Sequence, residues 1–354
     1  MTKSLAYIGA LVVCFAALPG SAIFAADLPQ ELLGKLQLPC SIAVRPESGQ
    51  PGEIFVADRG AGRILRLNPN QPDHSSTAIS GFPVDAADPA SVNAAGIQSI
   101  YFLDHMRLTV AGGGADGNFF VRAYELVDAD TQLRFDDQRQ SADLPEKSDS
   151  HTSAIRTFHD IARTRPNERV PDSLLLAAVS EDGPAGLWRV PIRANTIGNI
   201  EPLDENGDLD QLTAIGGLAV SPAGYIAAAI DPKEDDAKRT ELAFLNPVSG
   251  ETLLKLKTDL PRIVALAYQP STGDLFAACA TTRQASADGI YRLDDDSQSG
   301  TRTCRATKVA DIKRPTAIAF AADGTLYITA LGPRDGNNTP SGTLLRVPAA
   351  TPQQ

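Results

Sequence analysis

The chain has 354 residues, of which 43% are hydrophobic and 21% are charged. This length allows one large domain or two ordinary ones, and the apolar content is enough for a packed core. The formal net charge of −11 disfavours nucleic acid and anionic membrane surfaces as partners, because both repel an acidic chain.

The first 25 residues have the order of a secretory signal peptide. Lys3 precedes an apolar run over residues 5–18, and small residues follow as far as Ala25. The run is too short to span a membrane, and no second segment is long and apolar enough to do so. A lipoprotein signal would use Cys14, but Val13 before it is not the small residue that processing requires. We expect a signal peptide at 1–25, one domain at 26–354, and export to the periplasm or the medium.

Three cysteines remain after removal of the signal peptide, namely Cys40, Cys279 and Cys304. Their number is odd, and no two of them form a C-x-x-C pair. The strand pattern described below puts Cys279 and Cys304 on non-adjacent strands of one unit and Cys40 in another. Buried free thiols are therefore favoured over a disulfide.

Short apolar strands separated by turn residues recur in groups of three. In chain order, the first strands of the groups lie at 41–44, 99–102, 160–162, 217–220, 266–268 and 315–320. The last group is the clearest, because an Asp323-Gly324 turn joins its first strand to the apolar run 326–329, and 342–347 follows after a loop.

The six groups can be aligned on the middle of the first strand. The aligned positions are Ala43, Tyr101, Ala162, Ala219, Ala267 and Ala319. They are 48 to 61 residues apart, a spacing typical of propeller blades, whereas helical periodicity is nearly absent.

A weaker fourth strand follows five of the groups, at 76–80, 131–135, 199–203, 252–257 and 303–309. The sixth group has too few residues after it, but 31–39 near the N-terminus is similar to 251–261. We therefore predict an all-β, six-bladed β-propeller of four-stranded antiparallel blades, with an N-terminal strand that completes the last blade and covers its edge. The polar stretch 136–153 is predicted to be a surface loop.

The repeated positions are an apolar-Ala-apolar-x-Pro strand, as in 42–46, a glycine turn, and a strand with arginine in its third position, as in 64–67. These positions resemble six-bladed propellers of the NHL-repeat, gluconolactonase and strictosidine-synthase-like kind. The resemblance extends over the whole mature chain. Such positions determine packing and do not specify an activity.

By analogy with such propellers, ligands are expected at one end of the central channel, where the turns entering the first strands meet those between the second and third strands. A rim of arginines there could bind a carboxylate or a sulfate, since guanidinium groups suit planar anions. Its predicted members are Arg59, Arg262, Arg283, Arg314 and Arg334, with Asp58 and Asp335 beside them. The alternative is that these are solvated loop arginines, some of them paired with the two aspartates.

Lactonase-type members of the group bind a divalent cation at the channel through a Glu of the first blade and later Asn and Asp residues. The first strand here is entered through Pro39-Cys40-Ser41, which has no acidic residue. Asn93, Asp58 and Asp231 could rebuild a cage of oxygen ligands for Ca²⁺. The departure from the pattern leaves calcium-dependent lactone hydrolysis without direct support.

A second candidate calcium site lies on the acidic segment 204–210. Its oxygen-bearing side chains alternate along the chain, at Asp204, Asn206, Asp208 and Asp210. The segment has Leu209 where a calcium loop has glycine, and Ile215 where it has a carboxylate. A plain acidic turn is the alternative, and the sequence assigns no cofactor beyond this possible Ca²⁺.

Among the four histidines, only His159 falls where the channel is expected, and Asp160 follows it. A histidine oriented by a carboxylate can act as a general base, although one in a turn is more often a surface residue. No G-x-S-x-G sequence supports a serine nucleophile. The glycine-rich segment 112–117 precedes a strand rather than a helix, so it does not predict a phosphate site.

The sequence is compatible with three functions. The preferred one is an exported propeller without an assignable catalytic set, which binds a protein or a small-molecule ligand at the loops of the channel mouth. The alternative is a metal-dependent lactonase or hydrolase like the gluconolactonases. A third is a quinone-dependent sugar dehydrogenase, for which His159 is the only support.

Overall fold

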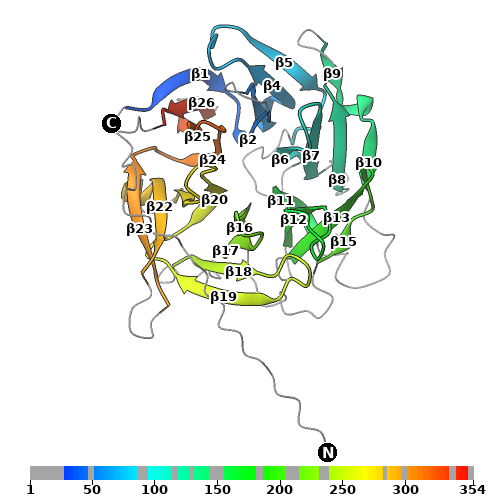
Figure 1. Ribbon diagram of the computed structural model, residues 1–354. Helices are drawn as coiled ribbons and strands as arrows, with labels where there is room; N and C mark the ends of the chain where they lie inside the picture. The colour runs from blue at the N-terminus through cyan, green and yellow to red at the C-terminus, as the bar shows by residue number, and fades with distance from the viewer. Residues whose placement is uncertain are drawn as a thin grey trace, which may run out of the picture.

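The structure is a computed structural model, and it describes residues 28–46, 52–85, 95–113, 119–126, 131–142, 155–180, 186–203, 215–230, 239–281, 285–296, 302–334 and 340–349. Within these ranges the strands form six sheets arranged in a ring around a central axis (Figure 1). The predicted all-β, six-bladed propeller is therefore confirmed. No helix in the described ranges is long and apolar enough to cross a membrane.

Each blade begins with a strand at the channel and proceeds outwards. The inner strands are β2 (Pro39–Val44), β6 (Gly96–Phe102), β11 (Ile155–Arg163), β16 (Ile215–Val220), β20 (Ile263–Tyr268) and β24 (Pro315–Phe320). The second strands are β3 (Ile54–Asp58), β7 (Arg107–Gly113), β12 (Ser173–Ser180), β17 (Ile226–Ile230), β21 (Leu275–Cys279) and β25 (Leu326–Arg334). Both faces of a second strand are covered by neighbouring blades, so these strands are continuous apolar runs.

The third strands are β4 (Arg63–Leu67), β8 (Phe119–Glu125), β13 (Gly186–Arg193), β18 (Glu241–Leu245), β22 (Gly289–Asp295) and β26 (Pro340–Val347). The outer strands are β5 (Ser75–Ser80), β10 (Gln140–Ala142), β15 (Glu201–Pro202), β19 (Thr252–Lys257), β23 (Cys304–Ala310) and β1 (Gln30–Leu36). The short strand β14 (Thr196–Ile197) forms a hairpin with the end of β13. The six sheets are therefore arranged around the channel like the blades of a propeller.

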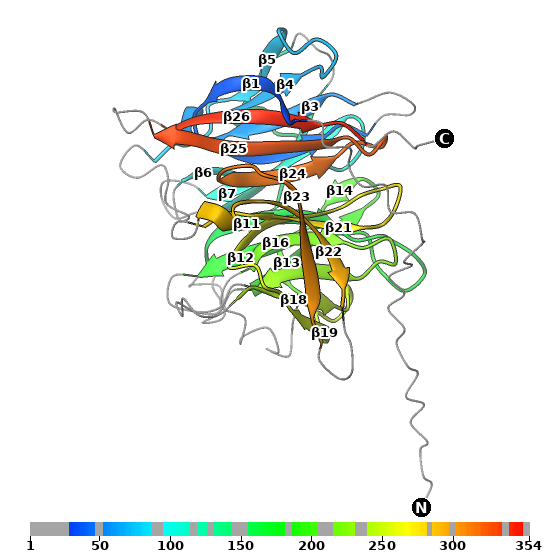
Figure 2. The ribbon, with the colours of Figure 1, turned by 90° about the vertical axis from the view of Figure 1, so that its left-hand side faces the viewer.

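The ring is closed by the N-terminal strand, as predicted. β1 pairs antiparallel with β26, and Gln30 lies opposite Arg346 while Leu36 lies opposite Gly342. Figure 2 shows β1, β26, β25 and β24 side by side in the last blade. Leu36 is 1% exposed and packs in an apolar cluster shared by the last and first blades. The two ends of the described chain therefore hold one sheet together.

The fourth strand of the second blade differs from the prediction. Residues 131–135 contribute β9 (Leu133–Arg134), which pairs in parallel with β5 and adds a fifth strand to the first blade. The reason is Phe135, whose ring packs against Phe82 and Phe120 between the first two blades. The fourth strand is instead β10, which lies inside the stretch predicted to be a loop and pairs with β8.

Six apolar clusters fill the spaces between neighbouring blades, one for each pair. The cysteines are part of this packing: Cys279 on β21 and Cys304 on β23 are buried free thiols in one cluster. Cys40 is half-buried in the first blade and is also free. Cys279 and Cys304 thus have the predicted burial and Cys40 does not. The core holds the inner strands in fixed positions around the channel.

Candidate functional site

Each inner strand carries a β-bulge at the same position of the repeat. One residue of the inner strand has no partner on the second strand there, so the strand bends and its side chains are re-aimed. The six extra residues are Cys40, Gln98, His159, Gly216, Val264 and Thr316. The bulge residues of the first three blades therefore carry a thiol, an amide and an imidazole, whereas those of the fourth and fifth blades are a glycine and a valine.

The residue after each bulge faces the following blade. In the first three blades this residue is Ser41, Ser99 or Asp160, and the three form a polar chain. Ser41 Oγ accepts a hydrogen bond from the Ile100 amide at 3.1 Å, and Ser99 Oγ donates to Asp160 Oδ1 at 3.2 Å. Asp160 Oδ2 accepts from the Leu218 amide at 2.8 Å. This chain, named the inter-blade latch here, joins the inner strands of four successive blades.

Asp160 is the one ionisable member of the latch. Its carboxylate also accepts a hydrogen bond from the Ile161 amide at 2.8 Å. Burial raises the pKa of Asp160 to about 6, because the hydrogen bonds from Leu218, Ile161 and Ser99 only partly compensate for the loss of water. The group therefore connects blades structurally and changes charge in weakly acidic solution.

In the fourth blade the same position is Gly217, and the inner strands approach one another more closely. A Cβ on Gly217 would lie 2.8 Å from Ala265 Cα and 2.9 Å from the Leu266 nitrogen, both backbone atoms that cannot swing away. We predict that Gly217→Ala lowers the free energy of unfolding by about 1–3 kcal/mol, as overpacking does. Urea unfolding would measure this loss.

Gly34→Ala is the matched control, because the added Cβ would meet only the exposed Glu31 carboxylate, at 2.6 Å. That side chain can move aside, so we expect little change in stability. Equal losses for the two variants would contradict the proposed close approach of the fourth and fifth blades.

The channel widens into a cavity of about 420 Å³ lined by the inner strands of all six blades. Five of the six aligned positions are alanine, which leaves space, and Tyr101 occupies the sixth. Ser41, Ser99 and Asp160 line one end of the cavity, and residues that follow the inner strands, such as Arg165 and Pro222, line the other. The cavity therefore lies towards the ends of the inner strands, away from the predicted arginine rim.

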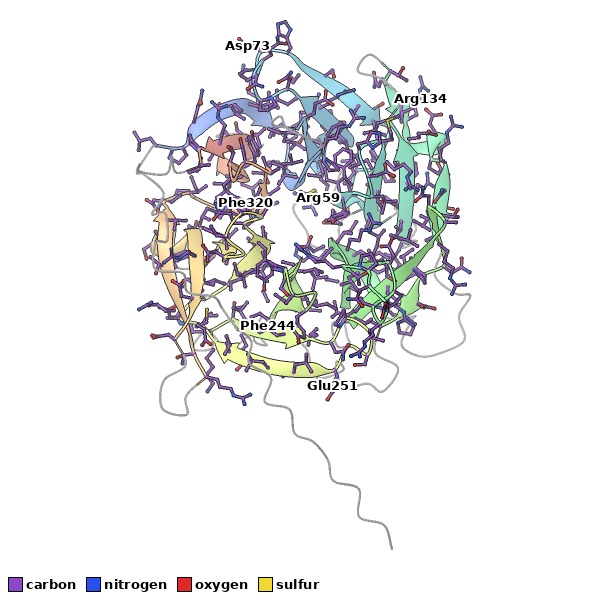
Figure 3. All side chains as sticks on the ribbon, in the orientation of Figure 1. Arg59, Asp73, Arg134, Phe244, Glu251 and Phe320 are labelled. Atoms are coloured by element: carbon purple, nitrogen blue, oxygen red, sulfur yellow. The ribbon has the colours of Figure 1, made fainter. Side chains whose placement is uncertain are left out.

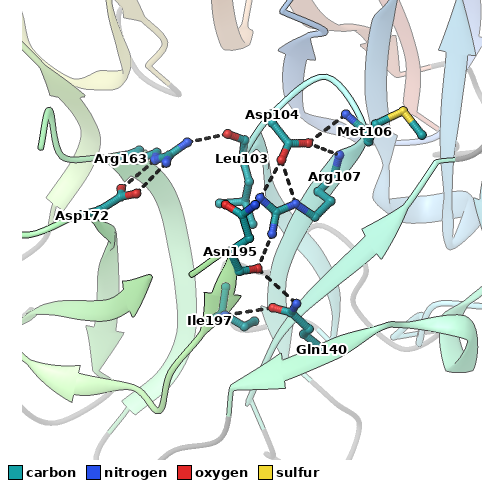
Figure 4. A network of polar contacts seen from close by, with 9 residues as sticks. All are labelled: Leu103, Asp104, Met106, Arg107, Gln140, Arg163, Asp172, Asn195 and Ile197. Carbon is teal, nitrogen blue, oxygen red and sulfur yellow. Dashed lines mark hydrogen bonds and ion pairs between the residues drawn. The ribbon is translucent and has the colours of Figure 1, made fainter. Parts of the chain in front are cut away.

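Arg163 also lines the cavity, but its charge is compensated. Its guanidinium donates to both carboxylate oxygens of Asp172, at 2.8 and 2.7 Å, and to the Leu103 carbonyl oxygen. Figure 4 shows this contact beside a second one, in which Arg107 binds Asp104 and the Asn195 carbonyl oxygen. The network fastens the second blade to the third, so Arg163 has a structural role at the opening of the cavity.

The predicted rim residues that the structure describes have different partners and different exposure. Arg59 is buried and donates to Gln98 Oε1, and Arg262 is exposed. The Arg314 guanidinium donates to the Gly332 carbonyl oxygen at 3.0 Å. Asp58 is completely buried and binds Arg63 at 3.1 Å rather than Arg59, and burial raises the pKa of Asp58 to about 6.

Most of the other predicted site residues lie outside the described part of the chain. They are Asn93, Asp204, Asn206, Asp208, Asp210, Asp231, Arg283 and Asp335, and of Arg334 only the backbone is described. Within the described part, no group of three or more His, Cys, Asp or Glu side chains could hold a metal ion. Both calcium sites therefore stay predictions.

His159 lies on the bulge of β11, but Asp160 does not orient it, because the carboxylate binds Ser99, Ile161 and Leu218 instead. Burial lowers the pKa of His159, and the charges of Arg262 and Arg59 lower it further, so its imidazole is neutral at pH 7. Burial also raises the pKa of the Cys40 thiol to about 11, which keeps it protonated and unreactive. The six bulge residues therefore include hydrogen-bond donors but no activated nucleophile.

Comparisons with known proteins yield matches only among solved structures, since no protein-family profile and no curated protein matches the chain. A luciferin-regenerating enzyme is 13% identical with a TM-score of 0.57, and the alignment covers 91% of this chain and 95% of that one. A gluconolactonase from Xanthomonas campestris is 13% identical with a TM-score of 0.51, covering 92% and 91%.

A third neighbour, from Thermus thermophilus, is provisionally described as an oxidoreductase (glucose dehydrogenase). It is 15% identical with a TM-score of 0.54, and the alignment covers 89% of this chain and 99% of that one. At such identities the likeness shows the fold alone. The chain is thus a six-bladed β-propeller with gluconolactonases and related propeller proteins among its structural neighbours.

Proposed function

We propose that the protein is an exported binding propeller that holds a small organic molecule in its central channel. The supporting observation is the cavity of about 420 Å³ bounded by all six inner strands. Ligand pockets in proteins commonly have about 300–1,000 Å³ and combine apolar walls with a few fixed polar groups. Walls made of packed β-strands are rigid, so a ligand would meet a site that is already formed.

The polar groups of the cavity restrict the chemistry of the ligand. The latch residues Ser41, Ser99 and Asp160 lie at one end, and Arg165 lies near the other. Between them, Tyr101 lies at the level of the five alanine positions, which favour a compact apolar or ring-shaped middle. A molecule with hydroxyl groups at both ends of a ring fits this arrangement, and glucono-1,5-lactone and glucose, suggested by the names of two neighbours, are suitable first probes.

We predict that Ala267→Phe, which fills the cavity from β20, abolishes ligand retention. The measurement is native mass spectrometry of protein isolated from the exported fraction, with and without the two sugar probes. The same spectra report whether the exported chain begins at Ala26. Ser76→Phe on the exposed outer strand β5 is the matched control, because it adds the same ring far from the channel.

The wild type and Ser76→Phe should carry the same added mass, and Ala267→Phe should carry none. Equal retention in all three would place the ligand outside the channel. A wild-type protein that retains nothing and is not stabilised by either probe would remove the support for channel binding, since a ligand of the folded state must raise its stability. A cytoplasmic chain that still begins at Met1 would contradict export.

A further inference from the structure

Arg59 is a buried cation whose side chain has a single, neutral hydrogen-bond partner among the described residues. The residue is 9% exposed, and Nη1 donates to Gln98 Oε1 at 2.9 Å. The Nε atom is buried and has no hydrogen-bond partner in the described part of the chain. Figure 3 shows Arg59 at the inner edge of the ring. Buried arginines normally make several hydrogen bonds and bind a carboxylate, so the hydrogen bonding of this guanidinium is incomplete.

The local backbone holds Arg59 in a fixed position. It begins the single-turn 3-10 helix η1 (Arg59–Ala61), where its amide donates to the Leu38 carbonyl at 3.2 Å and its carbonyl accepts from Gly62 at 3.0 Å. Gly62 adopts a left-handed conformation, with φ of 60°. The stem of the arginine packs on Gly96, where an added Cβ would lie 3.3 Å from Arg59 Cγ. The guanidinium is thus placed by its surroundings.

No described carboxylate compensates the charge of Arg59. The neighbouring Asp58 turns away to bind Arg63, at 3.1 Å. Asp160 is occupied by the inter-blade latch, and the Cys40 thiol stays protonated. His159 feels the positive charge of both Arg59 and Arg262, which lowers its pKa. Arg59 is therefore a buried positive charge that no carboxylate in the described part of the chain pairs with.

We propose that Arg59, positioned by Gln98, binds a small oxyanion at the bulge end of the channel. A guanidinium suits the planar or tetrahedral oxygens of a carboxylate, a sulfate or a phosphate, and Nε is free to complete the contact. The anion could be an inorganic ion or the acidic group of an organic molecule. The site lies on the other side of the inter-blade latch from the cavity, so it does not depend on the proposed cavity ligand.

The test is an NMR titration of the His159 imidazole, identified by the signal that His159→Gln removes. Sulfate or acetate is added at constant ionic strength, with chloride as the replaced salt. A bound anion offsets the nearby positive charges, so the pKa of His159 should rise by up to about one pH unit. His74 and His105 in the same sample report general salt effects.

Arg59→Gln should raise the pKa of His159 without any added anion and should abolish the response to sulfate and acetate. Arg189→Gln is the matched control, because it removes an arginine that pairs with Glu201 at 2.6 Å in the third blade, and it should respond like the wild type. Arg59→Lys, which keeps the charge without the guanidinium geometry, should respond more weakly. Ala267→Phe should keep the full response, which separates this site from the cavity.

A response to sulfate and acetate alike supports a site for free oxyanions, and a response to acetate alone supports a site for a carboxyl group of a larger molecule. The proposal is overturned if neither anion moves the pKa of His159 in the wild type. It is equally overturned if Arg59→Gln responds as strongly as Arg189→Gln does.

Discussion

A chain that begins at residue 39 is expected to lose the folded propeller, whereas a chain that begins at residue 28 is expected to unfold like the full-length protein. The shorter chain lacks β1, and with it the backbone pairing to β26 from Gln30 to Leu36. It also loses Leu32 and Leu36, which are 7% and 1% exposed. Removing a buried leucine side chain costs about 2–5 kcal/mol, and native proteins are stable by only about 5–15 kcal/mol.

Circular dichroism during heating and size-exclusion chromatography would measure this effect. The loss of β1 also exposes the edge of β26, so the shorter chain is expected to aggregate. Leu36→Ala in the longer chain is a milder version of the same test and should lower the free energy of unfolding by about 2–4 kcal/mol. If the chain from residue 39 stays monomeric and melts with the longer chain, closure of the ring by β1 is wrong.

The second large effect is expected for Asp160→Ala, which should lower the free energy of unfolding by about 3 kcal/mol. The substitution leaves the Leu218 and Ile161 amides and the Ser99 hydroxyl without their acceptor, and each unsatisfied buried group costs about 1–3 kcal/mol. Asp160→Asn keeps one acceptor oxygen and the side-chain shape, so its effect should be smaller. Urea unfolding at pH 7 would compare the two variants.

The same residue makes stability depend on pH. Its pKa is about 6 in the folded protein against an ordinary value of 3.8, so the folded state binds the proton more tightly than the unfolded chain does. The contribution of Asp160 to the free energy of unfolding therefore decreases as pH rises from about 4 to about 6 and is constant above that. The difference of about two between the folded and the ordinary pKa of Asp160 corresponds to about 2–3 kcal/mol in the free energy of unfolding.

Asp160→Asn isolates this contribution, because the amide does not titrate. Between pH 4 and pH 7, the free energy of unfolding of Asp160→Asn should rise by about 2–3 kcal/mol relative to that of the wild type. Urea unfolding at both pH values would measure this. Asp58, whose pKa is also raised to about 6, acts in the same direction but is present in both proteins. An unchanged difference between the two proteins across this range would show that Asp160 is not the titrating group.

The architecture could be predicted because it depends on local patterns. Short apolar runs and glycine turns determine where strands begin and end, and all six aligned positions lie on inner strands at one equivalent place. Ala43 pairs with Phe55 and Ala319 with Tyr327, for example. Residues 131–135 were assigned to the wrong blade, because the packing of Phe135 between two blades is a contact over long distance that no local pattern reports.

The site was less predictable from sequence. The inter-blade latch lies two residues before the aligned positions, so its members could have been compared directly, as Ser41, Ser99 and Asp160. The hydrogen-bond partners of these residues could not be predicted, since the Leu218 amide, for example, belongs to another blade. Similarly, Asp58 and Arg59 are adjacent in sequence, yet a strand and a turn send their side chains to different partners. The different directions of two adjacent side chains depend on backbone geometry, which the residue types alone do not specify.

The most direct test of channel binding is a crystal structure of the protein purified without refolding, from crystals grown in the presence of sulfate. We predict electron density for a small molecule between Tyr101 and the inter-blade latch, and for an oxyanion against Arg59. Density for bound molecules only on the outer loops, with nothing but water along the channel, would contradict it.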